Sequence, residues 1–355
     1  MKVLPLSSLF LLTFAYLCPL PFTHSPFQPE RLVAVRALPP EIAGKFRELA
    51  DLQQAADGSY YAFDRRSHSV HRLNAAWTSM TRIVSIGQAK GELLQPSAFD
   101  SAADIFAVSD APFGLDRVQV FYKDGTPLGA FQPRIRSLPR VTLGGVVMNG
   151  AGNLALTSDR VLLGEPDTGW LVSEYGIDGS LKRNFGHLRA TGHEGDADVH
   201  IGLNTGIPLV AADGGTWFVF QAGVPALRKY DAKGTLEFER HMEGIELDPI
   251  VKALPMTWPR QRAGNDRELP LIQPNVQAAA VAPDGSLWIA LSIPYVYVFD
   301  SSGDKRRVVQ LESAGTLSAT SLAFSRDGRL IATPGGYEFD AGSPARNRAA
   351  PGSRP

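Results

Sequence analysis

Six side chains of the kinds that bind metal ions occur between residues 187 and 200: His187, His193, Glu194, Asp196, Asp198 and His200. Imidazole nitrogens and carboxylate oxygens are ligands for Zn²⁺, and two aspartates one residue apart can supply oxygens to Ca²⁺. The spacing matches no established metal-binding motif, and glycines at positions 192 and 195 are typical of a solvated polar loop. Two interpretations follow: a Ca²⁺ or Zn²⁺ site formed by His193, Asp196, Asp198 and His200, or a polar loop with no cofactor.

Three aspartates, Asp64, Asp110 and Asp159, each follow a short apolar stretch that reads as a strand. If these strands belong to equivalent units of a ring, their ends gather on one face. Three carboxylates gathered there could bind a cation or a basic ligand. The alternative is that each carboxylate caps its own turn by accepting hydrogen bonds from nearby backbone N–H groups.

A third group combines an aromatic ring with cations: Trp258, Arg260 and Arg262, followed in the sequence by Arg267. Stacking on the indole and pairing with the guanidinium groups would suit an anionic or sugar ligand. An exposed loop whose arginines simply lie along its surface is the alternative.

A repeat must position these residues. A turn centred on Asp-Gly or a related pair recurs six times, at residues 57–58, 103–104, 150–152, 213–214, 284–285 and 327–328. Most intervals are roughly 45 residues, the repeat length of a four-stranded propeller blade. Each turn precedes a short apolar strand, and most of these precede another; residues 287–291 and 296–299 are the clearest pair. One such unit cannot bury both of its faces, so the units must pack against each other.

The pattern predicts an all-β fold: a six-bladed β-propeller of four-stranded blades over residues 31–340. The sixth unit is one strand short, because the chain after Phe339 is rich in Gly, Ser, Pro, Ala and Arg. Residues 31–38 alternate like a strand, so we expect this N-terminal strand to close the ring, with a plain linker as the alternative. Two long connections, 186–206 and 241–277, interrupt the repeat, and residues 247–253 are expected to form a short helix. Such connections usually lie over one rim, where loops carry function.

Residues 84–125 carry a further pattern: Gly87, Gly91, Glu92 and Pro96 before an apolar strand, Asp110 at its end, then Val118, Val120, Phe121 and Gly125. In this it resembles the NHL-type and bacterial six-bladed β-propeller families. The resemblance extends over about residues 45–340. The resemblance implies the propeller fold and a binding surface, and it indicates no particular catalytic activity.

The N-terminal segment has the pattern of an export signal. Lys2 precedes an apolar run over residues 4–17 that is too short to span a membrane comfortably, and Pro19 and Pro21 end it. We expect a signal peptide over residues 1–24, or a retained anchor, and a periplasmic or extracellular protein. Cys18, the single cysteine, lies in this segment; its lipidation is an alternative. Membrane contact is expected only through this segment, if it is retained or lipidated. Residues 341–355 are expected to be a disordered tail.

The composition narrows the function. A net charge of −1 argues against nucleic acid as a partner, because phosphate binding needs a strong basic excess. We find no Gly-rich phosphate loop, no Gly-x-Ser-x-Gly and no His-Glu-x-x-His. The sequence therefore favours a monomeric, rigid binding platform for a protein, a small molecule or a sugar, without catalysis.

Two alternatives stay open: a metal-dependent hydrolase, lactonase or lyase with its site in the central channel, and a structural module of a cell-envelope assembly. The first rests on Asp284-Gly285-Ser286-Leu287-Trp288, which is similar to a phrase of the gluconolactonase-type lactonases. Their Glu-Gly-Pro-x-Trp motif is absent from this sequence.

Overall fold

The computed structural model describes residues 29–133, 141–143, 146–148, 153–263 and 267–342. The expected signal segment, the expected turn at residues 150–152 and residues 343–355 of the expected tail lie outside these ranges. Within the described ranges, no helix is both long and apolar enough to cross a membrane.

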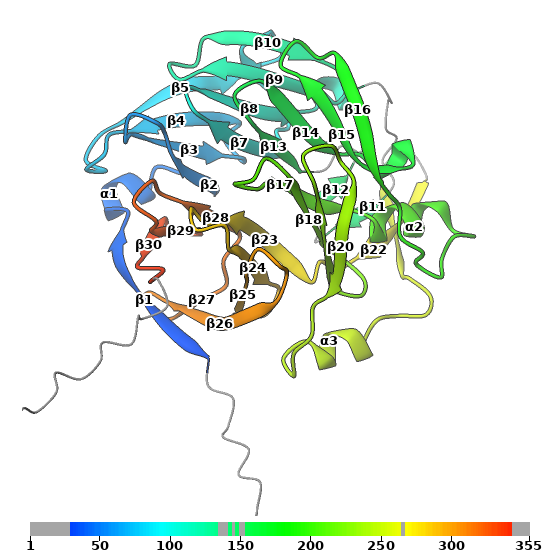
Figure 1. Cartoon of the computed structure of the whole chain (residues 1–355). Coiled ribbons are helices and arrows are strands. Elements are labelled where there is room, and N and C mark those ends of the chain that lie inside the picture. Colours follow the sequence, from blue (N-terminus) through cyan, green and yellow to red (C-terminus); the bar gives the residue numbers. More distant parts are fainter. Residues whose placement is uncertain (1–28, 134–140, 144–145, 149–152, 264–266, 343–355) are drawn as a thin grey trace, which may run out of the picture.

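Short, mostly antiparallel strands, joined in chain order, make up about half of the described chain (Figure 1). The predicted turns form where glycine supplies a positive φ: 83° at Gly58, 79° at Gly214, 84° at Gly285 and 81° at Gly328. We name each sheet by its first strand. The β2 sheet contains β2 (Leu49–Gln54), β3 (Tyr60–Asp64), β4 (Ser69–Leu73), β5 (Met80–Ile86) and β6 (Glu92–Leu93). The β7 sheet contains β7 (Ala98–Ala102), β8 (Ile105–Asp110), β9 (Arg117–Tyr122) and β10 (Pro127–Phe131).

The remaining sheets follow the same order. The β13 sheet contains β13 (Leu154–Leu156), β14 (Arg160–Gly164), β15 (Trp170–Gly176) and β16 (Leu181–His187). The β17 sheet contains β17 (Gly206–Val210), β18 (Thr216–Phe220), β19 (Ala226–Tyr230) and β20 (Leu236–His241). The β23 sheet contains β23 (Val276–Val281), β24 (Leu287–Leu291), β25 (Val296–Phe299), β26 (Lys305–Glu312) and the short β27 (Thr316–Leu317). The β28 sheet contains β28 (Ser321–Phe324), β29 (Leu330–Thr333) and β30 (Tyr337–Phe339).

The first strands of these sheets contact one another in a closed ring. β2 contacts β7, β7 contacts β13, β13 contacts β17, β17 contacts β23, β23 contacts β28, and β28 contacts β2 again. The first strand of each sheet is therefore the inner one, and the later strands lie progressively further out (Figure 1). Antiparallel sheets repeated radially around a centre define a β-propeller.

The third repeat differs from the prediction by one strand. Residues 154–157 were expected to be the counterpart of residues 60–63, a second strand, but β13 is the inner strand of its sheet. The inner turn lies at residues 157–159, where the Thr157 N–H donates to the Arg160 carbonyl at 2.8 Å. This turn contains no glycine; the Thr157 hydroxyl accepts from the Arg160 N–H at 3.0 Å instead, so the Asp-Gly signal is missing.

An N-terminal strand completes the β28 sheet, as residues 31–38 predicted. β1 (Glu30–Ala37) pairs antiparallel with β30, with Ala34 opposite Phe339 and Ala37 opposite Tyr337. The sequence did not predict that β1 also pairs in parallel with β26, with Glu30 opposite Val309 and Val33 opposite Glu312. This second pairing joins the β23 and β28 sheets through hydrogen bonds.

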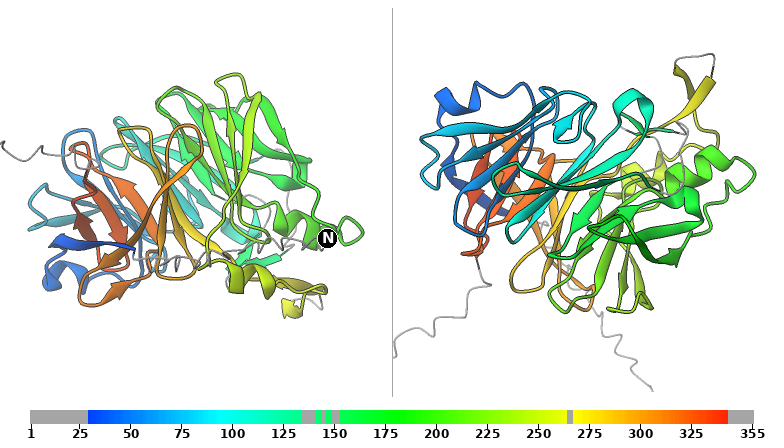
Figure 2. Two further views of the ribbon diagram at one scale, coloured as in Figure 1. Left: turned by 60° about the horizontal axis from the view of Figure 1, so that its bottom comes forward. Right: turned by 90° about the horizontal axis from the view of Figure 1, so that it is seen from above.

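The two rims of the ring differ. One, here the turn face, carries the tight turns between first and second strands. The other, here the loop face, carries the connections that lead into each inner strand. These connections include the helices α1 (Pro40–Ala43), α2 (Ala197–Leu203) and α3 (Asp248–Lys252), which lie along the lower side of the left view in Figure 2. α3 confirms the helix expected at residues 247–253.

An additional small sheet forms beside α2. It consists of β11 (Val141–Leu143), β12 (Val146–Met148), β21 (Arg260–Ala263) and β22 (Arg267–Ile272). β22 and β11 both contact α2. The long connections thus pack on one another over one part of the rim. Two short 3₁₀ segments, η1 (Pro112–Gly114) and η2 (Pro166–Thr168), follow the second strands of the β7 and β13 sheets.

The core lies between neighbouring sheets, because the middle strands are buried on both faces. All described residues of β3, β8, β18 and β24 are buried. Aromatic rings connect adjacent sheets: Phe63 stacks on Phe99 at 5.5 Å, and Trp288 meets Phe324 edge-on at 5.6 Å. Each sheet therefore depends on a partner at either side.

The double pairing of β1 generates the first testable prediction. A chain that lacks residues 1–37 should aggregate or oligomerise and melt at a lower temperature, because the edges of both β26 and β30 lose their partner and can pair with other chains. Light scattering after size-exclusion chromatography, with thermal melting, measures both effects. A chain that lacks only residues 1–28 keeps β1 and serves as the control. Equal stability and a monomeric state in both truncated chains would refute the closing role of β1.

The second prediction concerns Trp288, which is 2% exposed and packs between the β23 and β28 sheets. Trp288→Ala should lower the free energy of unfolding by about 3–5 kcal/mol, as expected for removal of a buried large aromatic. Denaturant titration measures the change. Phe113→Ala is the control, because that ring is 75% exposed, and its loss should change stability by less than about 0.5 kcal/mol. Equal effects of the two substitutions would contradict the assigned packing.

Candidate functional site

A cavity of about 1280 Å³ occupies the centre of the ring. Residues of all the inner strands line it, among them Asp51 of β2, Asp100 of β7 and Ala279 of β23. Among the described residues, the lining continues past the strands only on the loop face, through Arg47 and Gln221 among others, and includes none of the inner turns. The cavity therefore opens at the loop face, where the long connections lie.

Polar side chains of β2 and β7 form one side of the cavity, here the polar wall: Asp51, Gln53, Asp100 and Ser101. The Gln53 amide donates to Asp51 Oδ2 at 2.9 Å, and its carbonyl accepts from the Ser101 backbone N–H at 2.9 Å and hydroxyl at 2.7 Å. Asp100 Oδ2 accepts from the Leu156 N–H of β13 at 2.7 Å. These bonds cross from one inner strand to the next, so the polar wall also ties adjacent sheets together.

The two carboxyl groups of the polar wall titrate close to neutral pH. Burial raises the pKa of Asp51 to about 7, and the nearby Asp100 carboxylate raises it further, against hydrogen bonds from Gln53 and Leu52 that lower it. Burial likewise raises the pKa of Asp100 to about 6, although the Leu156 N–H bond opposes the shift. Both side chains keep partial exposure to the cavity, so a bound molecule could contact them.

Apolar side chains dominate the other side, here the apolar wall: Leu154, Leu156, Ile207, Leu209, Ala279 and Val281. These residues belong to β13, β17 and β23. The cavity is thus divided between a carboxylate-bearing wall and a hydrocarbon wall. A molecule that fills it would meet both.

Charged side chains surround the opening of the cavity. Arg65 forms an ion pair with Glu48, and Arg47 and Asp116 also line this region. Directly beneath, Asp64 accepts hydrogen bonds from the N–H groups of Arg47 at 2.8 Å and Glu48 at 3.0 Å. Asp64 therefore fixes the backbone that carries the charged rim.

The three aspartates expected to gather on one face do not do so. Asp64 is 0% exposed and Asp110 is 1% exposed. Each is the last residue of a second strand, at the loop face, and accepts from backbone N–H groups. Asp110 accepts from the Leu94 N–H at 3.1 Å and pairs with Arg117 at 2.6 Å. Both fit the turn-capping interpretation rather than a ligand site.

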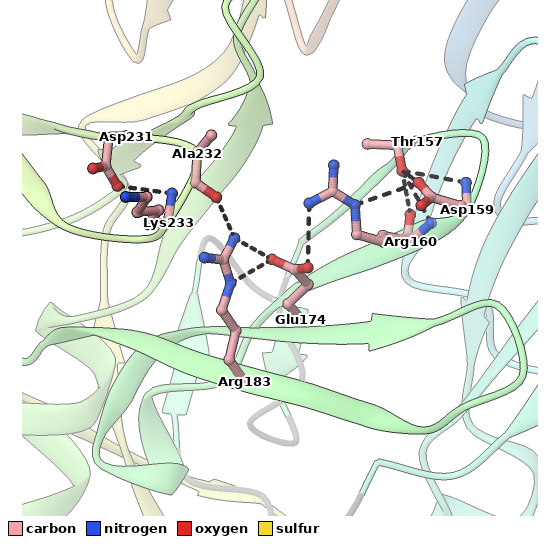
Figure 3. A network of polar contacts seen from close by, with 8 residues as sticks. All are labelled: Thr157, Asp159, Arg160, Glu174, Arg183, Asp231, Ala232 and Lys233. Atoms are coloured by element: carbon pink, nitrogen blue, oxygen red, sulfur yellow. Dashed lines mark hydrogen bonds and ion pairs between the residues drawn. The ribbon is translucent and has the colours of Figure 1, made fainter.

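Asp159 lies on the opposite rim. It belongs to the inner turn of the β13 sheet, so it sits at the turn face while Asp64 and Asp110 are at the loop face. Figure 3 shows it beside Arg160, which also reaches Glu174 at 3.2 Å. Arg183 pairs with the same Glu174 at 2.6 Å and donates to the Ala232 carbonyl of the β17 sheet at 2.9 Å. Asp159 is part of an ion-pair network between two sheets, so the three aspartates do not come together on one face.

The predicted aromatic and cationic patch is also structural where its side chains are described. Trp258 is 8% exposed and packs with Val199 and Leu203 of α2 and Ile272 of β22. Arg260 pairs with Asp196 at 2.5 Å, while Arg262 is exposed on β21. The ring expected to stack on a ligand is therefore largely buried against α2 and β22.

Each residue of the predicted metal loop has a protein partner. Asp196 caps α2 by accepting from the Val199 N–H at 3.3 Å, and it is also the residue paired with Arg260. His193 Nε2 lies 3.4 Å from the Trp258 indole nitrogen, His200 Nδ1 lies 2.8 Å from the Thr191 hydroxyl, and Asp198 also makes a polar contact. Over the described ranges, no three His, Cys, Asp or Glu side chains converge as a set that could hold a metal ion. The Ca²⁺ or Zn²⁺ expectation thus gains no support from this geometry.

Sequence reasoning missed Asp51 and Asp100. The signal was present, because each is a charged residue inside a strand that precedes an inner turn, and Gln53 shares the face of Asp51 at period two. The turn signal marks the strand that follows each turn, and this is the second strand in every sheet except the β13 sheet. It does not mark the inner strand before the turn, which lines the channel.

Comparisons with known proteins add little to this geometry. No protein-family model and no curated protein matches the chain. A streptogramin B lyase structure is 9% identical with a TM-score of 0.49, covering 82% of this chain and 93% of that one. The WD40 repeats of RRP9 are 11% identical with a TM-score of 0.46, covering 80% and 72%. A chain of the mitotic checkpoint complex is 11% identical with a TM-score of 0.49, covering 93% and 98%. Similarities this low carry no argument about function, and the propeller assignment rests on the ring of sheets described above.

The raised pKa of Asp51 predicts how stability depends on pH. Its folded pKa of about 7 lies above the ordinary value of 3.8, so the folded state binds the proton more tightly, and stability falls as pH rises from about 4 to about 7. Asp100, Gln53 and Ser321 act on the Asp51 carboxyl, and the substitution Asp51→Asn leaves these three residues unchanged. The free energy of unfolding of this variant, taken relative to that of the parent, should therefore rise by roughly 2–4 kcal/mol from pH 4 to pH 8, since one pKa unit corresponds to about 1.4 kcal/mol.

Urea titrations of both proteins across this pH range measure the difference. Asp284→Asn is the matched control, because this substitution removes the same charge from a residue at an exposed turn. It should leave the pH dependence unchanged. Parallel curves for the parent and Asp51→Asn would show that the Asp51 carboxyl is not the group that titrates.

Proposed function

We propose that this protein is an exported, monomeric binding platform that holds a small ligand in its central cavity, entered from the loop face. The proposal takes the ring as six-bladed, with β2, β7, β13, β17, β23 and β28 as the inner strands. The cavity is the observation that carries it. At about 1280 Å³ it can enclose a drug-sized molecule, for which ligand pockets usually measure roughly 300–1,000 Å³.

Two properties of the cavity favour a small ligand over a protein partner. Both walls are formed by inner strands that contact the inner strands of the two neighbouring sheets, so the walls are pre-organised. Pre-organised walls reduce the ordering cost of binding. In addition, the side chains of the polar wall lie inside the cavity, where the flat surface of a protein partner would not reach them.

A second candidate, a hydrolase or lyase acting in the same cavity, is favoured by one observation. A carboxyl group with a pKa of about 7, as at Asp51, can donate or accept a proton at neutral pH, which general acid–base catalysis requires. Nothing else among the described residues marks a nucleophile or a metal set there.

The experiment uses N-phenyl-1-naphthylamine, a neutral dye whose fluorescence increases in apolar surroundings. The parent should bind it at one site. Gln277→Trp should weaken binding at least tenfold, because Gln277 lines the cavity with partial exposure and an indole there occupies ligand space. Leu236→Trp is the matched control, because it adds the same ring on β20, where the leucine is 48% exposed.

Equal binding by the parent and both variants would place the dye outside the cavity and overturn the proposal, as would the absence of binding by the parent. Metal analysis of the purified full chain separates the second candidate. Stoichiometric Ca²⁺ or Zn²⁺ that disappears in Asp51→Asn would support the hydrolase or lyase instead.

A further inference from the structure

Acidic side chains outnumber basic ones in the cavity, and this excess favours a cationic ligand. Among the described residues, its lining includes two arginines, Arg47 and Arg65, against four carboxyl groups, those of Glu48, Asp51, Asp100 and Asp116. Both arginines belong to the opening, and Arg65 is paired with Glu48 there. Within the described ranges, no Lys, Arg or His forms an ion pair with Asp51 or Asp100. The deeper part of the cavity therefore carries negative charge on one wall only.

We propose that the ligand of this cavity is an amphipathic amine, with its ammonium group between Asp51 and Asp100 and its apolar body against the apolar wall. This inference rests on the proposed function and names the chemical class of the ligand.

Hydrogen-bonding capacity supports an ammonium group at this point. An ionised carboxylate offers about four acceptor positions on its two oxygens. Asp51 accepts from the Leu52 N–H at 2.8 Å and the Gln53 amide at 2.9 Å, and the Ser321 side chain is a third partner. Asp100 accepts from the Leu156 N–H at 2.7 Å and has the Ser101 N–H and the Gln53 side chain as further partners. Each carboxylate thus retains about one acceptor position, and an ammonium group, whose donors must be satisfied when it leaves water, can use both.

The same residues suit an ammonium better than a metal cation. Ca²⁺ takes six to eight oxygen ligands, and a zinc site usually takes at least three protein ligands. Among the described residues of the polar wall, two carboxyl groups face the cavity, and the Gln53 carbonyl is already occupied by the Ser101 N–H and hydroxyl. Two carboxylates are too few for a metal site but match a single organic cation.

The apolar wall supplies the second requirement. Ile207, Leu209, Ala279 and Val281 line the cavity on strands of the β17 and β23 sheets. Burying hydrocarbon there stabilises a complex in proportion to the area removed from water. A small hydrophilic cation would leave this wall unused, so the expected ligand combines an amine with an aliphatic or aromatic body.

The test compares three probes with one apolar body and different charge: 4-phenylbutylamine, 4-phenyl-1-butanol and 4-phenylbutyrate. Each is titrated by calorimetry against the full chain at pH 8 and by displacement of N-phenyl-1-naphthylamine. The amine should bind roughly tenfold more tightly than the alcohol, because a charge-assisted hydrogen bond is about twice as strong as a neutral one. The carboxylate should bind most weakly.

Asp51→Asn combined with Asp100→Asn should reduce amine affinity to about that of the alcohol, and it should lower amine affinity far more than alcohol affinity. Asp284→Asn should change none of the three affinities. Should the double variant fail to fold, Asp51→Asn alone must still lower amine affinity selectively. Equal binding of the three probes, all reduced by Gln277→Trp, would overturn the amine inference while keeping the cavity as the binding site. No binding by any probe or the dye would overturn the proposed function itself.

Discussion

The structure depends on the burial of both faces of every sheet. The second and third strands are largely buried on both sides, and strands such as β3, β8 and β24 are buried along their whole length. A sheet of this kind is unstable alone, because each face exposes hydrocarbon to water. Packing sheets in a closed ring gives each face a neighbour and leaves no sheet uncovered. The last sheet would still lack an outer strand, and β1 supplies it while pairing with β26 as well.

The same ring creates the cavity and sets its chemistry. Inner strands converge at the centre, but their side chains do not fill it. Along β2 and β7 the sequence places polar groups there, and these bond across the seams, as Gln53 does to Ser101 and Asp100 to the Leu156 N–H. The residues offered to a ligand are therefore also residues that connect sheets. Their carboxyl groups lie in a poorly solvated place, which raises both pKa values.

The loop face shows how side chains that resemble a functional site can instead serve the fold. Asp196 caps α2 and pairs with Arg260, and Trp258 lies under α2 with its indole nitrogen close to His193. Two groups that looked like separate ligand sites in the sequence are the two sides of one packed contact. Asp64 and Asp110 likewise hold the connections that lead into the inner strands.

The sequence by itself determined the strands, most turns and the closing of the last sheet, because these follow from local rules: glycine at positive φ, alternation of apolar residues, and a unit that lacks a strand. It failed at the third repeat, where Thr157 and Asp159 form the inner turn without glycine. The tertiary structure alone decided which strands face the centre and which aspartates meet. Asp51 and Asp100 are 49 positions apart and carry no shared motif; they become neighbours because two sheets contact along their inner strands. Asp159 lies on the opposite rim from Asp64 and Asp110, because the strand before it is a first strand where a second strand was expected.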